Sequence, residues 1–130
     1  MPAIGHGFSL DGYLLSIEAK LLQEALQQSE GDRAVVEATR HLPNLHVIAG
    51  LSWTTFGQAD VDELRALLDE GAIKGLKIYP GYEPFYPADR KLAPAYELAE
   101  AYDVPVMIHT GDTYARTAKV KYSHPINVDE

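Results

Sequence analysis

Hydrophobic and polar positions follow a helical period in some segments and form short apolar runs in others, and the two kinds of segment alternate along the later part of the chain. Apolar side chains recur every three or four residues in four segments, which is the spacing of helices with one buried face: 13–28, 33–40, 60–70 and 91–102. Short apolar runs separate the later segments and are typical of buried strands: 45–53, 75–80 and 104–109, with a further stub at 2–4. The pattern predicts an α/β fold.

The three strand candidates recur at a regular interval. They begin near Val47, Gly75 and Val104, which are 28 and 29 residues apart. One βα unit of an eight-stranded barrel takes about 30 residues. Strands that alternate with helices in this way form a parallel sheet. We therefore expect residues 1–130 to form one partial (β/α)8 TIM barrel domain, about strands three to five with their flanking helices.

Local signals predict where the helices begin and end. Asp60, followed three positions later by Glu63, has the spacing of a capping pair, and Gly71 is placed to end that helix. The loop at 81–90, GYEPFYPADR, is rich in glycine, proline and aromatic residues. Such a loop can be an active-site lid or a rigid cover over the strand ends, and the sequence leaves both interpretations open.

Alternation of side chains along the strands predicts which residues face a common site. Lys77 and Tyr79 share one face of their strand, and His109 ends the next one. Active sites of parallel α/β proteins lie at the carboxyl ends of the strands. We expect these three side chains to converge there. For the strand at 45–53 the alternation is ambiguous and favours neither face.

His109 is the residue with the most informative chemistry, because an imidazole at a strand end can bind a metal or transfer a proton. It is followed by Thr110 and, after a glycine, by Asp112, which can equally cap the turn. His124 lies in the next loop, within reach of the site. The other histidines are weaker candidates: His6, His41 and His46. No H-x-H or H-E-x-x-H spacing is present.

Composition excludes several classes of partner. The formal net charge is −8, which disfavours partners held through their phosphates, such as nucleic acids, and anionic membrane surfaces. The absence of cysteine excludes disulfides and thiolate metal sites. The N-terminus has no signal-like or membrane-inserting segment, and we expect a cytoplasmic protein.

Three segments carry a resemblance to a known family: GLKIYPGYEPFYPADRKLAPAYELAEAYDVPVMIHTGDT, then KYSHP, and more weakly HLPNLHVIAGL. Through them the sequence resembles the amidohydrolase-related proteins, TIM-barrel metal-dependent hydrolases that include the aminocarboxymuconate-semialdehyde decarboxylases. The resemblance implies that His109 is a metal ligand and that Lys77 matches a lysine that bridges two metals in some members.

The chain also departs from the family pattern. The strand-one H-x-H pair is missing, and a strand-six histidine and a strand-eight aspartate would lie beyond Glu130. Since a catalytic metal needs about three protein ligands, we expect a fragment that is inactive by itself. The resemblance implies C–N or C–O hydrolysis, or decarboxylation of a small carboxylate, with zinc or manganese. The expected substrate contacts are Tyr79, Thr110, Asp112 and His124.

Two other functions remain open at this point. Lys77 can serve as the nucleophile of a Schiff-base lyase, which needs no metal. Alternatively, the chain is a non-catalytic interaction remnant. A partial barrel and an interaction remnant would both expose strand edges. Because exposed edges favour association between copies of a chain, we expect a homo-oligomer.

Overall fold

The computed structural model describes residues 31–129 and divides the chain into two compact units, Met1–Leu45 and His46–Glu130. The helix predicted at 13–28, the stub at 2–4 and His6 lie outside the described residues. In the first unit, helix α2 spans Asp32–Thr39, one residue ahead of the prediction at both ends. Its buried Thr39 donates a hydrogen bond from Oγ1 to the carbonyl oxygen of Val35, at 2.9 Å.

The second unit contains a three-stranded parallel sheet in the order β1-β2-β3. The strands are β1, Ala49–Gly50, β2, Leu76–Ile78, and β3, Val106–Ile108. Leu76 is in register with Ala49 on one side and with Val106 on the other. The parallel arrangement that the regular spacing predicted is confirmed.

The strands are shorter than the apolar runs that predicted them. The sheet ladder holds only two or three residues of each run, although single hydrogen bonds continue it at either end. Lys74 donates from its backbone N to Val47 O at 2.8 Å before β2 begins, and Leu51 N donates to Lys77 O at 2.9 Å after β1 ends. An apolar run includes residues that pack in the core, whereas a strand includes only the residues that pair in the hydrogen-bonded ladder. The predicted strand boundaries were therefore too wide.

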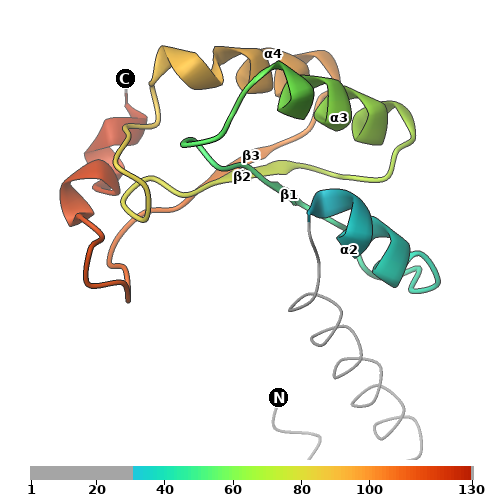
Figure 1. Ribbon diagram of the computed structural model, residues 1–130, viewed down its shortest axis with the longest axis horizontal. Coiled ribbons are helices and arrows are strands. Elements are labelled where there is room, and N and C mark those ends of the chain that lie inside the picture. The colour runs from blue at the N-terminus through green and yellow to red at the C-terminus, as the bar shows by residue number, and fades with distance from the viewer. Residues whose placement is uncertain (1–30, 130) are drawn as a thin grey trace, which may run out of the picture. The chain divides into compact units, whose positions relative to one another are not determined.

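Two helices lie on the same face of this sheet, α3 at Gln58–Asp69 and α4 at Ala93–Ala101 (Figure 1). A short 3-10 turn, η2, Arg90–Leu92, precedes α4. The strand side chains on the opposite face from Tyr79 are buried: Leu76 and Ile78 are 0% and 1% exposed. The helices add further core residues: Val61, Leu64, Leu67 and Leu68 from α3, and Ala95, Leu98 and Ala99 from α4.

The predicted N-cap of α3 was wrong by three residues. Gly57 is the N-cap, and its backbone N donates to Asp60 Oδ2 at 2.8 Å. The carboxylate therefore satisfies a free N–H group from inside the first turn, where it also interacts favourably with the helix dipole. At the other end the prediction is confirmed, because the helix stops just before Gly71, whose N donates to Leu68 O at 3.0 Å.

The segment after β3 returns to the loops at the carboxyl ends of β2 and β3. It contains two 3-10 turns, η3, Val120–Tyr122, and η4, Pro125–Val128. Between them Ser123 is 1% exposed, and its Oγ donates to Gly111 O at 2.7 Å. Within residues 31–129 no helix has the length and apolar character needed to cross a membrane.

Candidate functional site

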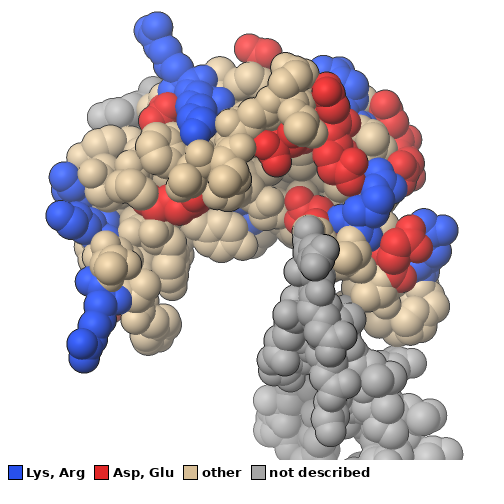
Figure 2. All heavy atoms as spheres, viewed as in Figure 1, with Lys and Arg blue, Asp and Glu red and all other residues tan. Residues whose placement is uncertain are grey.

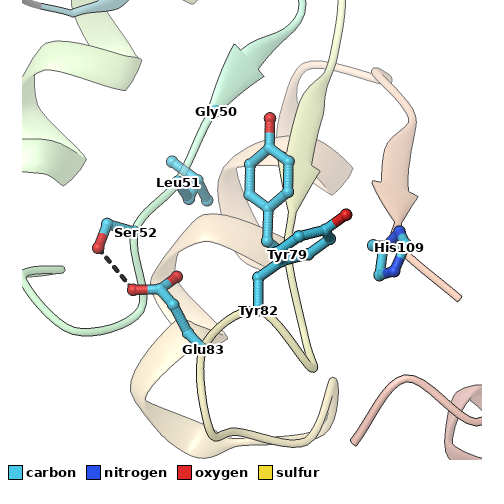
Figure 3. A pocket seen from close by; sticks show the side chains of 7 residues that line it. All are labelled: Gly50, Leu51, Ser52, Tyr79, Tyr82, Glu83 and His109. Carbon is cyan, nitrogen blue, oxygen red and sulfur yellow. Dashed lines mark hydrogen bonds between the residues drawn. The ribbon is translucent and has the colours of Figure 1, made fainter. Parts of the chain in front are cut away.

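A hollow of about 630 Å³ lies at the carboxyl ends of the three strands. Figure 3 shows its side chains, which come from the ends of β1, β2 and β3 and from the loop after β2. The lining residues are Gly50, Leu51, Ser52, Tyr79, Tyr82, Glu83 and His109. This is the edge of a parallel sheet at which α/β enzymes build their sites, and all lining residues belong to the second unit.

Aromatic rings form one wall of the hollow. Tyr82 contacts both of the predicted residues there, with its ring centroid 4.9 Å from that of His109 and 6.4 Å from that of Tyr79. The two tyrosines meet edge to face, a favourable arrangement of aromatic quadrupoles. Lys77 does not line the hollow; its Nζ lies 5.8 Å from the ring centroid of Tyr79.

His109 is held by two contacts of different kinds. Its backbone N extends the sheet ladder by donating to Ile78 O at 3.1 Å, and its ring Nε2 lies 3.1 Å from Asp112 O. A carbonyl oxygen only accepts, so the second contact is a hydrogen bond when the ring proton is on Nε2. That tautomer leaves the Nδ1 lone pair to accept a proton or bind a metal ion.

Glu83 is the most strongly bound charged group of the site. Its Oε1 accepts hydrogen bonds from Ser52 Oγ at 2.7 Å, Thr54 Oγ1 at 2.8 Å and Thr54 N at 3.0 Å, and its Oε2 accepts one from Trp53 N at 2.9 Å. Burial by itself raises the pKa of this carboxyl, but the four hydrogen bonds together outweigh burial and hold the pKa below its ordinary value. Glu83 is therefore ionised at neutral pH.

A stack of side chains fixes the rim beside Glu83. The rings of Trp53 and Phe85 are parallel within 4°, with centroids 5.7 Å apart. Lys91 places its Nζ 4.8 Å from the Trp53 ring centroid and donates to Thr54 O at 3.2 Å. Phe85 is 2% exposed, so the loop at 81–90 is anchored in the core. Of the two interpretations of this loop, the contacts favour a rigid cover.

The structure separates the predicted site residues into two groups. Tyr79 and His109 line the hollow, whereas Thr110, Asp112 and His124 do not. Asp112 Oδ1 accepts from Thr113 N at 2.8 Å, which is the turn-capping role considered for it. His124 accepts from Ile126 N through its Nδ1 at 3.2 Å and thereby caps η4.

Several lining residues were not predicted from the sequence. Gly50 and Ser52 occupy alternate positions of the run at 45–53, whose parity was ambiguous. Tyr82 and Glu83 lie in an aromatic loop, where no regular period predicts which way a side chain points. The available sequence signal is a loop rich in glycine and proline directly after a strand. It identifies this loop as part of a site but does not identify the individual residues.

The described residues can be compared with the ligand set that a bound metal ion requires. Within the described part of the chain, no three His, Cys, Asp or Glu side chains are grouped so that they could hold one. His109 supplies one nitrogen, and the Glu83 oxygens already accept four hydrogen bonds. Since a catalytic site needs about three protein ligands, residues 31–129 do not fit a complete metal centre.

Comparison with known proteins gives one match. A family model described as Amidohydrolase matches residues 18–130, which is most of the chain. No curated protein and no solved structure matches. The matched region includes the whole sheet, the hollow and His109, so the resemblance that the sequence motifs carried is confirmed. The chain belongs to the amidohydrolase family.

Proposed function

We propose that this chain is a fragment of a metal-dependent hydrolase that acts on a small molecule in the hollow at the strand ends. The reaction is C–N or C–O hydrolysis, or decarboxylation of a small carboxylate. The observation that supports this most is the position of His109 at the carboxyl end of β3, with its Nε2 3.1 Å from Asp112 O and its ring against Tyr82. The matching family model makes a hydrolase the natural interpretation of that geometry.

The cofactor in this proposal is a divalent metal, zinc first and manganese as the alternative, with His109 as one ligand. The remaining ligands have to come from outside residues 31–129, because these residues provide no group of three. The fold follows the same proposal: the three parallel strands are consecutive strands of a (β/α)8 barrel. Among residues 31–129 no further strand pairs with the outer edges of β1 and β3. Such open edges would favour association between copies of the chain.

The proposal predicts that the chain alone does not retain zinc. A single imidazole binds Zn²⁺ weakly, whereas tight sites have three or four protein ligands. Purified chain is loaded with zinc, dialysed against metal-free buffer and measured by atomic emission. We expect far less than one zinc per chain and no hydrolysis of amide, ester or carboxylate test compounds.

His109→Asn is the matched variant for this experiment. It should retain the same small amount of zinc as the natural sequence after dialysis. Retention of one zinc per chain in the natural sequence, lost in His109→Asn, would show that the chain holds a complete ligand set and would overturn the proposed incompleteness.

A further inference from the structure

Glu83 is an acidic residue inside the site rather than on the outer surface. In Figure 2, acidic side chains gather over α3, whereas Glu83 is partly buried at the strand ends and lines the hollow. Its four accepted hydrogen bonds all come from residues 52–54, and they match the about four lone-pair sites of a carboxylate. Glu83 is therefore engaged as an anchor, with little acceptor capacity left for a ligand or a proton.

The backbone of Glu83 closes the turn that carries Tyr82. Its N donates to Tyr79 O at 3.2 Å, and its O accepts from Gly81 N at 3.0 Å and from Phe85 N at 2.9 Å. The side chain of the same residue is bonded to the segment after β1, 29 to 31 positions earlier in the chain. One residue thus fixes the turn after β2 to the end of β1.

The position of the Tyr82 ring depends on this turn. Tyr82 is 42% exposed, so packing in the core does not hold its ring in place. The ring lies between those of Tyr79 and His109 (Figure 3), with centroids 6.4 Å and 4.9 Å away. The imidazole of His109 is therefore contacted twice, at Nε2 by Asp112 O and on its ring by Tyr82. Together the two contacts restrict its orientation.

We propose that Glu83 is a positioning residue for His109 and acts through Tyr82. The carboxylate fixes the turn, the turn places the Tyr82 ring, and the ring keeps the imidazole in the orientation in which it lines the hollow. This inference rests on the proposed function, because the orientation matters for an imidazole that binds a metal ion there. Groups that orient a ligating histidine support metal binding without touching the metal.

The test measures the ring-current shift that Tyr82 produces on the His109 ring protons, in NMR spectra of the full chain with a chelator present. Tyr82→Leu keeps an apolar side chain and removes the aromatic ring, so it defines the full shift. Glu83→Gln should lose most of this shift. Thr54→Val removes one of the four donors to Glu83 and should lose a smaller part, in the same direction.

Glu97→Gln is the matched control, because Glu97 is an exposed carboxylate of α4. It should leave the His109 ring signals where they are in the natural sequence. The backbone amide signals of Lys77 and Met107, which are in register across β2 and β3, show whether each variant is folded. A purely structural role of Glu83 would lower stability and leave the His109 signals of the folded chain in place.

Three results would each overturn the inference. The first is a Tyr82→Leu variant whose His109 signals do not move, and the second is a Glu97→Gln variant that moves them as far as Glu83→Gln. The third is unmoved signals in folded Glu83→Gln, or in Thr54→Val if Glu83→Gln does not fold. Because the chelator removes metal ions, this test and the zinc measurement fail independently of each other.

Discussion

Replacement of Gly81 by alanine should lower the free energy of unfolding by about 3 kcal/mol. Gly81 has a φ of 96°, which strains any residue that has a Cβ. The added Cβ would also lie 2.8 Å from Ser123 Oγ and 3.0 Å from Ser123 Cβ. Ser123 cannot move away easily, because it is buried and bonded to Gly111. Denaturant unfolding followed by circular dichroism measures the loss.

Gly111 provides a control with nearly the same backbone conformation. Its φ is 95°, and an added Cβ would meet no heavy atom within 4 Å. Gly111→Ala should therefore show the backbone strain alone, about 1 kcal/mol. If the two variants lose the same stability, Ser123 does not pack against Gly81 as closely as described.

Replacement of Glu83 by glutamine should cost about 2 kcal/mol at neutral pH. The substitution keeps the shape of the side chain but removes its charge and turns one acceptor oxygen into a donor. That donor then faces hydroxyl and N–H groups of residues 52–54, which already donate to Glu83. This loss of stability is small for four charge-assisted hydrogen bonds, because several of the partner residues are solvent-exposed.

The loss should depend on pH in one direction. The pKa of Glu83 in the folded chain lies below its ordinary value of 4.5, so the carboxylate stabilises the fold above that pH. This contribution disappears as the pH falls through the lowered pKa. The stability difference between the natural sequence and Glu83→Gln should therefore be constant near neutral pH and shrink in acid, as read from unfolding curves over a pH series.

Glu97, an exposed residue of α4, gives the charge-matched control. Glu97→Gln should change stability by no more than about 0.5 kcal/mol, as do most surface substitutions. An effect of Glu83→Gln as small as that of Glu97→Gln, or a difference that grows in acid, would contradict the hydrogen-bonded and ionised carboxylate.

Local periodicity predicts that Tyr79 and His109 share a site at the strand ends, and both line the hollow, whereas Lys77, placed with them by the same argument, does not. Tyr79 and His109 end two apolar runs, and a period of two places both side chains at the same edge of a parallel sheet. This argument needs only neighbouring residues and the assumption that the strands are parallel. No face was assigned to the run at 45–53, although its odd positions are all apolar and its even positions include polar ones, so Gly50 and Ser52 were missed.

The remaining residues depend on contacts between distant segments. Glu83 bonds residues 29 to 31 positions away, and the Ser123 hydroxyl reaches back 12 residues to Gly111. Neither residue has a periodic neighbour that reveals its partner. The N-cap of α3 was mispredicted for a related reason. An acidic residue in the first turn of a helix and an acidic N-cap give similar sequence patterns, so the pattern predicts Asp60 as the N-cap.

We propose that the His109 ring, which lines the hollow, binds a metal ion. Titration of the full chain with zinc can be followed through the ring nitrogen signals of its five histidines in ¹⁵N NMR spectra. Zinc should shift the His109 signals before those of His124, whose Nδ1 already accepts a hydrogen bond, and His109→Asn should remove this first response. Unchanged His109 signals while the other histidines respond would show that His109 is not the zinc ligand.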